Sequence, residues 1–219
     1  RIYDNNLNRE QVLDNWIADT QVGNVMLERY THNNVYDEYG RITAANLPKD
    51  LPYFILEATE LPQYKGDKKT VSGQYVDPVY GVFSFTFDGC QINVQGTSSA
   101  IYYIKNLDLQ FKNGFNLDTG NASTYALRQG SIPFNRFVLK ADVASSESAN
   151  NTVLSMLYSD MSPYKTPEQE INPKVRQGIE GIPIVMFWRN TDTNELTFMG
   201  KYNFNLPKRA PEPLGYSGN

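Results

Sequence analysis

The sequence contains few of the residues on which most metal and catalytic sites depend. One cysteine, Cys90, and one histidine, His32, occur in 219 residues. A single cysteine excludes an internal disulfide and a cysteine-rich zinc site, and a single histidine excludes multi-histidine metal sites. We expect Cys90 to be a small packing residue. His32 lies in the polar stretch THNN, which is more typical of a solvated loop than of a Ser-His catalytic pair.

Long apolar runs and clusters of basic residues are also absent. No apolar run reaches the ~20 residues of a membrane-spanning helix, and no signal-peptide pattern opens the chain. The chain has 20 basic and 24 acidic residues, a net charge of −4, with both signs mixed along its length. No segment concentrates positive charge as a nucleic-acid surface requires. We therefore expect neither a membrane span nor a nucleic-acid partner.

Aromatic residues, by contrast, are abundant, with 15 tyrosines and 11 phenylalanines. Aromatic and β-branched residues favour strands, and the many asparagines favour turns and loops. A composition of this kind is common in virion and extracellular structural proteins, so it is a first, compositional indication of a structural role.

The spacing of apolar residues changes along the chain and predicts two parts. Residues 8–31 have helical spacing and predict an amphipathic helix, followed by a polar connection. From residue 51 the spacing is that of strands. We therefore expect an N-terminal helix and connecting segment over 1–49 and a main domain over 50–219. Because the chain begins with Arg1 and ends in APEPLGYSGN, we also expect it to be a fragment of a longer polypeptide.

The main domain is predicted to be α+β, with a largely antiparallel sheet of about six strands and one packed helix. Strand patterns lie at 51–58, 82–87, 91–94, 101–111, 136–143, 182–188 and 195–203. Asp88-Gly89 predicts a two-residue hairpin turn, and residues 64–78 and 113–131 are predicted loops. A helix is predicted over 145–161, and its buried face is expected to consist of Val153, Leu154, Leu157, Tyr158 and Met161.

The stretch QGTSSAIYYIK, residues 95–105, is the main candidate site. Its Gly-rich turn, with Gly96, Ser98 and Ser99, is able to offer backbone N–H groups to a phosphate, although it is neither a Walker A loop nor a GxGxxG loop. If 101–111 is a strand, Lys105 lies on its more apolar face. A buried ammonium has to reach water, pair with an acid, or hold an anion.

The residues alone favour a structural role for this lysine. An ion pair with Asp142 or Glu147, or an edge position that reaches water, is the expected arrangement. A glycosidase is not predicted either, because Glu168, Glu170 and Glu180 lie in loop-like segments with no spacing that indicates a facing carboxylate pair.

Several segments resemble the CotH kinase-like family of spore-coat proteins. QGTSSAIYYIKNLDLQF is similar to the glycine–serine-serine–lysine signature of that family. RFVLKADVASSESANNTVLSML is similar to its next strand and helix, and IPIVMFWRNTDTNELTFMGKYNFNLPK to the following hairpin. YKGDKKTVSGQYVDP and GKYNFN resemble most closely a branch found in virion proteins of tailed phages, crAss-like phages included. The resemblance covers residues 50–216, in collinear order.

The resemblance implies a fold like the N-terminal lobe of a kinase and places a nucleotide site at Gly96, Ser98, Ser99 and Lys105. The family's catalytic and metal-binding aspartates lie in a second lobe, downstream of the segment that this chain matches. Phosphoryl transfer requires such carboxylates besides the lysine. We therefore expect no catalytic residue, metal site or cofactor in this chain, and ATP with Mg²⁺ only if a second lobe lies outside it.

The sequence as a whole predicts a non-catalytic structural component of a bacteriophage particle, in its tail, neck or muzzle region. The protein would be assembled in the host cytoplasm and located in the virion. Its expected partners are other virion proteins in a symmetric oligomer, with contact to the host surface in addition. An atypical ATP-dependent kinase is the alternative, and carbohydrate binding through exposed aromatic residues is a second alternative.

Overall fold

The computed structural model describes residues 47–49, 51–127, 131, 133–141, 150–162 and 178–207. Contacts group the chain from Leu51 onwards into one compact unit. Several predicted features lie outside the described residues: the helix over 8–31 with the connection after it, and the side chains of His32, Asp142, Glu147, Glu168 and Glu170.

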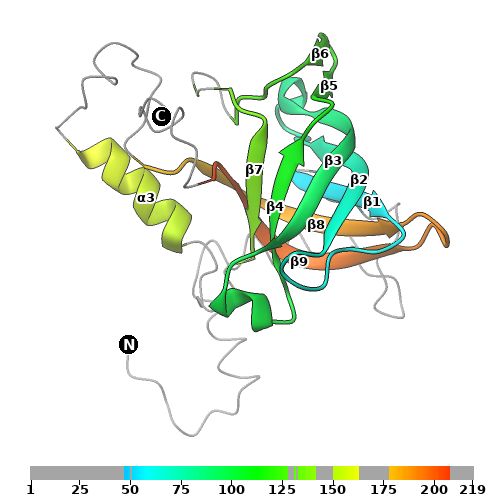
Figure 1. Ribbon diagram of the computed structural model, residues 1–219. Coiled ribbons are helices and arrows are strands. Elements are labelled where there is room, and N and C mark those ends of the chain that lie inside the picture. Colours follow the sequence, from blue (N-terminus) through cyan, green and yellow to red (C-terminus); the bar gives the residue numbers. More distant parts are fainter. Residues whose placement is uncertain are drawn as a thin grey trace, which may run out of the picture. The chain divides into compact units, whose positions relative to one another are not determined.

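Nine strands make up about half of the described structure (Figure 1). They are β1 (Tyr53–Ala58), β2 (Lys68–Val76), β3 (Phe85–Gln95), β4 (Asn106–Phe111), β5 (Phe115–Leu117), β6 (Gly120–Ala122), β7 (Arg136–Lys140), β8 (Gly181–Asn190) and β9 (Leu196–Asn205). The other described elements are the α-helix α3 (Asn150–Met161) and two 3₁₀ helices, η2 (Gly81–Phe83) and η3 (Ser98–Ile101).

Seven of these strands form a closed barrel. Neighbouring strands follow the order β2-β1-β8-β9-β7-β4-β3, and β3 pairs in turn with β2. The pairs are antiparallel except for β1 with β8, which is parallel. The short hairpin of β5 and β6 extends from β3. Closure leaves the seven barrel strands without a free edge.

The prediction of an α+β domain with a kinase-lobe-like sheet is therefore wrong. About half of the described chain is strand, its main sheet is closed, and it contains one α-helix. The decisive element is β2, which the sequence pattern placed in a loop because its outward positions are polar. Val71 and Tyr75 of this strand are buried in the barrel. Because β2 pairs with both β1 and β3, it closes the sheet.

The predicted turn at Asp88-Gly89 is instead a β-bulge inside β3. Val71 pairs with Cys90 and Gly73 with Phe87, so Ser72 alone lies opposite Asp88 and Gly89. Gly89 has φ +69°, a conformation that glycine adopts easily and that the extra residue of a bulge requires. The Ser72 hydroxyl also donates a hydrogen bond to Asp88 Oδ1 at 2.6 Å. The strand therefore bends here and continues to Gln95.

Aromatic side chains fill the barrel, as expected for a closed sheet of this size. Phe85 lies near the centre of the cluster, with its ring 4.5 Å from that of Tyr125 and 5.0 Å from that of Phe115. The largest fully buried aromatic side chains are Phe54, Tyr75, Phe111, Phe115, Phe137, Phe187, Tyr202 and Phe204. Cys90 is also fully buried in this core. The rigid, apolar interior supports the loops that leave the barrel ends.

The helix predicted over 145–161 is present as α3 from residue 150, and residues 145–149 lie outside the described part of the chain. The orientation of α3 is the reverse of the predicted one. The five apolar residues expected to be buried are all exposed: Val153, Leu154, Leu157, Tyr158 and Met161. The buried side instead includes Thr152. The reason is that the helix is attached through polar side chains.

Candidate functional site

Residues 96–105, here named the projecting loop, join β3 to β4 at one end of the barrel. The structure brings all four predicted nucleotide-site residues, Gly96, Ser98, Ser99 and Lys105, into this one loop. It contains the 3₁₀ helix η3, and β4 begins only at Asn106. The predicted strand over 101–111 is therefore wrong in its first half, and Lys105 lies outside the strand.

Gly96 turns the chain out of β3. Its φ is +111°, which is open to glycine and strained for other residues. A Cβ atom at this position would lie 2.1 Å from Ser99 Oγ. The turn therefore packs against its own serine, which leaves little room between Gly96 and Ser99.

The Lys105 ammonium is used within the loop. Its Nζ donates a hydrogen bond to the carbonyl oxygen of Ala100 at 2.9 Å. The carbonyl oxygen of Lys105 in turn accepts a hydrogen bond from the Tyr202 hydroxyl of β9 at 3.1 Å. Burial raises the pKa of the Tyr202 phenol, so this group stays a neutral donor at physiological pH. These two bonds attach the base of the loop to its own turn and to the barrel.

Asn106 connects the loop to a second strand. Its Nδ2 group donates to Ser99 Oγ at 3.1 Å, and its Oδ1 accepts from the backbone N–H of Ala141 at 2.8 Å. Asn106 is buried, where unpaired polar groups are costly. Within the loop, the N–H of Tyr102 donates to Ser99 O at 3.3 Å. The projecting loop therefore has a defined conformation held by several polar contacts.

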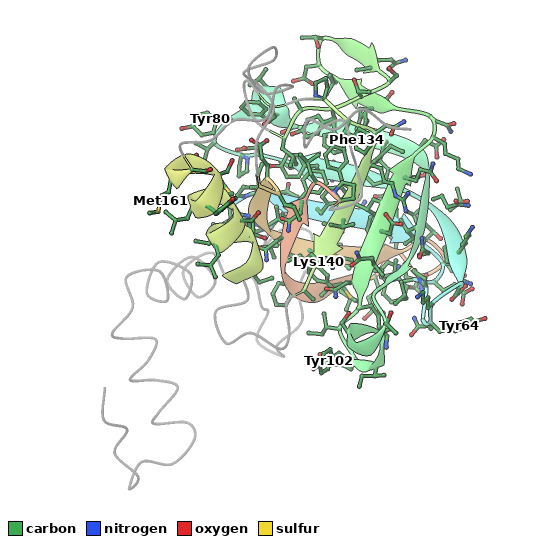
Figure 2. All side chains as sticks on the ribbon, turned by 60° about the vertical axis from the view of Figure 1, so that its left-hand side comes forward. Tyr64, Tyr80, Tyr102, Phe134, Lys140 and Met161 are labelled. Atoms are coloured by element: carbon green, nitrogen blue, oxygen red, sulfur yellow. The ribbon has the colours of Figure 1, made fainter. Side chains whose placement is uncertain are left out.

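The outer part of this loop is apolar and exposed. Ile101 is 81% exposed and Tyr103 90% exposed, and Tyr102 between them is also exposed. Figure 2 shows Tyr102 at the end of the barrel where the loop leaves the strands. The sequence pattern placed these three residues, here named the tip, in the first half of the strand predicted over 101–111. The Gly-Thr-Ser-Ser sequence before them was the available signal for a turn.

Tyr64 adds a further exposed ring at the same end of the barrel. It precedes β2, whose first residue, Lys68, pairs with Asn93 near the end of β3. Tyr64 is exposed, and Figure 2 shows it on the same lower side as Tyr102. Exposed tyrosines with defined backbones are typical of protein-interaction surfaces, because they contribute large contact area at low entropic cost.

Groups suited to covalent or metal chemistry are not assembled in the described part of the chain. No three His, Cys, Asp or Glu side chains gather there as a group able to hold a metal ion. Cys90 is in the core, and burial raises the pKa of its thiol, which opposes formation of a nucleophilic thiolate. Glu180 is buried and accepts a hydrogen bond from the Ser131 hydroxyl at 2.5 Å. Its observed contacts are those of a structural carboxylate.

No protein-family model matches this chain, and no curated protein does so either. The resemblance to the CotH kinase-like family and its phage branch therefore stays a prediction. Among the helices of the described residues, none has the length and hydropathy needed to cross a bilayer.

Proposed function

We propose that this protein is a non-catalytic structural component of a bacteriophage particle, in its tail, neck or muzzle region, and that the tip contacts another virion protein. The observation that carries the proposal is the exposure of Ile101 and Tyr103 on a loop whose conformation is fixed by Lys105, Ser99 and Asn106. A preordered apolar surface loses little entropy on binding.

Two features of the sequence support the virion part of the proposal. One is the resemblance of YKGDKKTVSGQYVDP and GKYNFN to the phage branch. The other is the richness in Tyr and Phe, which here fill a small barrel and also occupy its exposed loops. The proposal keeps the resemblance to phage proteins. It does not include a kinase-like lobe, because the sheet is a closed barrel.

Neither alternative is favoured by a specific contact. The kinase alternative needs a lysine that binds phosphate, whereas the Lys105 ammonium donates to the carbonyl of Ala100. Carbohydrate binding would use Tyr103 as a stacking platform, but the tip also exposes the aliphatic side chain of Ile101. A protein partner fits the pairing of an aliphatic and an aromatic side chain.

Photocrosslinking in purified phage particles tests the proposal. A benzophenone side chain placed at position 103 is expected to crosslink to another virion protein, which mass spectrometry of the product identifies. The same group at position 80, in the loop at the other end of β3, is the matched control for exposure. Particles that lack the protein, or that contain it with no crosslink from position 103, would reject the proposal. Binding of the purified protein to a glycan array through Tyr103 would favour the carbohydrate alternative.

A further inference from the structure

The connection between β4 and β5 is short and is fixed at both ends. Phe111 ends β4 and Phe115 begins β5, so residues 112–114 join the two strands. Both phenylalanine side chains are buried, and their rings lie 4.5 Å apart in the core. Figure 1 shows the β5–β6 hairpin at the upper end of β3 and β4. The position of this hairpin therefore depends on the residues that link it to β4.

The connection requires glycine at position 114. Gly114 has φ +79°, in the left-handed region that residues other than glycine avoid. A Cβ atom at this position would also lie 2.4 Å from the carbonyl oxygen of Ala122. The backbone angle and the lack of space therefore both select glycine directly after Asn113.

Asn113 is exposed and lies outside the strands. A Cβ atom on Gly89 of β3 would lie 2.3 Å from Asn113 Nδ2, so the side-chain amide lies over a residue that has no side chain. Asn113-Gly114 is the one Asn-Gly pair in the sequence. Asparagine cyclises most readily when glycine follows it, because no side chain keeps the glycine nitrogen away from the amide carbon. The fold therefore places a chemically reactive pair on the surface.

The sequence also contains one Asp-Gly pair, Asp88-Gly89, which is able to form the same ring. Both residues lie inside β3, between Phe87 and Cys90, which are paired with β2. The Asp88 carboxylate also accepts a hydrogen bond from the Ser72 hydroxyl at 2.6 Å. Ring formation requires the backbone to rotate, and the hydrogen bonds between strands oppose such a rotation. The strand therefore protects this second pair.

We propose that Asn113 is a site of spontaneous deamidation in the folded protein. The backbone nitrogen of Gly114 forms a bond to Cγ of Asn113 and loses its proton, and the side-chain amide leaves as ammonia. Water then opens the resulting succinimide ring at either carbonyl carbon, which gives aspartate or isoaspartate at position 113. The overall reaction consumes one molecule of water, releases one molecule of ammonia, and requires no oxidant or reductant.

Deamidation changes the connection in two ways. Either product places a negative charge beside Gly89, the residue that follows Asp88. Isoaspartate also carries the main chain through its side-chain carbon, so it inserts one more atom between Phe111 and Phe115. Because both rings are packed in the core, the inserted atom strains the connection. The isoaspartate form is therefore expected to be less stable than the aspartate form.

Incubation of the full chain in water enriched in heavy oxygen tests the site. Oxygen from this water enters residues that are deamidated during the incubation, and fragmentation of peptides digested in ordinary water locates it. We expect the label at position 113, as both aspartate and isoaspartate, and its loss in Asn113→Gln. Asn116 and Asn121 are the matched internal controls, because both are exposed in the same hairpin and are followed by leucine and alanine.

A synthetic peptide with the sequence FKNGF, residues 111–115, sets the duration of the incubation. Once this peptide has reacted completely, a folded chain without label at position 113 overturns the proposal. Equal labelling of Asn116 or Asn121 also overturns it, because the connection would then have no special reactivity. Label at position 113 without any isoaspartate would reject the succinimide route. Circular dichroism shows that the chain is folded throughout, and the test does not rest on the proposed virion function.

Urea denaturation of the separated products tests the effect on the hairpin. Asn113→Asp supplies the aspartate form, with the same added charge and a main chain of normal length. The isoaspartate form, separated by ion exchange, is expected to unfold at a lower urea concentration than Asn113→Asp. An isoaspartate form as stable as Asn113→Asp would overturn the expected strain between Phe111 and Phe115.

Discussion

The Lys105 ammonium donates a hydrogen bond to the carbonyl oxygen of Ala100, 2.9 Å away, within the same loop. This contact gives a structural reason for a lysine in an otherwise apolar stretch. A carbonyl acceptor satisfies one of the three ammonium donors and leaves the charge close to solvent. The lysine therefore fixes the turn that carries Ile101 and Tyr103, and a phosphate would have to compete with that role.

Lys105→Met should loosen the projecting loop without unfolding the barrel. Loss of one partly exposed hydrogen bond is expected to cost about 1 kcal/mol in the free energy of unfolding. The amide of Tyr102, which donates to Ser99 O, should exchange with solvent faster. Urea denaturation and hydrogen exchange measure the two effects. Lys112→Met, at an exposed lysine after β4, should change neither, and ATP binding by the wild type that Lys105→Met abolishes would contradict the structural role.

Gly96→Ala should destabilise the protein for two separable reasons. A left-handed backbone angle at a residue other than glycine costs roughly 1–2 kcal/mol, and the new Cβ would lie 2.1 Å from Ser99 Oγ. Adding Ser99→Ala removes the clash and leaves the backbone strain. The double variant should therefore recover part of the loss in thermal or urea denaturation. Full stability of Gly96→Ala alone would show that the turn differs from the one described.

Two tyrosines in the core give opposite predictions for removal of a hydroxyl. The Tyr75 hydroxyl is buried and has no hydrogen-bond partner among the described residues, so Tyr75→Phe should be neutral or stabilising. The Tyr125 hydroxyl donates to Phe83 O at 2.9 Å, so Tyr125→Phe should cost roughly 0.5–1.5 kcal/mol. Denaturation of the two variants in parallel compares them directly. If Tyr75→Phe lowered the free energy of unfolding more than Tyr125→Phe does, the hydrogen-bonding described for the two hydroxyls would be refuted.

Asp67 should contribute to stability at neutral pH and lose that contribution in acid. The backbone N–H of Gln63 donates to Asp67 Oδ2 at 3.0 Å; with Lys69 beside it, this bond lowers the pKa of the carboxyl. A lowered pKa in the folded state adds stability above the unfolded value of about 3.9, and the addition is lost as the pH falls through the folded value. Asp67→Asn should therefore be less stable than wild type at pH 6, and the difference should shrink below about pH 4. A difference that grows in acid would contradict this sign.

Strands with strong local patterns could be predicted from the sequence. β1, β7 and the β8–β9 hairpin lie where apolar and β-branched residues predicted them. At least one face of each of these strands is buried, so the spacing of apolar residues along the sequence indicates which side chains are buried. The four predicted site residues also lie together, because they are close in sequence.

The rest depends on contacts between distant residues. β2 reads as a charged loop, and only its pairing with β1 and β3 makes it a strand. Asp88-Gly89 is a hairpin signal in isolation, but the pairing of Ser72 opposite both residues makes it a bulge. Barrel closure is likewise a property of the whole sheet.

Exposure was the least predictable quantity. The apolar residues of α3 indicated a buried face, yet Thr152 and Ser155 attach the helix and leave that face outward. The tip was missed for a related reason, because Ile101 and Tyr103 fit the alternation of a strand. A periodic pattern of apolar residues predicts that one face of an element is buried. It does not distinguish burial in the protein's own core from burial against a partner.

Incorporation of the protein into phage particles tests the central claim most directly. The measurement compares the amount of wild-type chain, the double variant Ile101→Ser/Tyr103→Ser, and the control Tyr80→Ser in purified particles. Loss of two central contact residues, at about 1–2 kcal/mol each, should reduce incorporation of the double variant at least about tenfold, while the control remains at the wild-type amount. Equal incorporation of all three folded proteins would contradict the account.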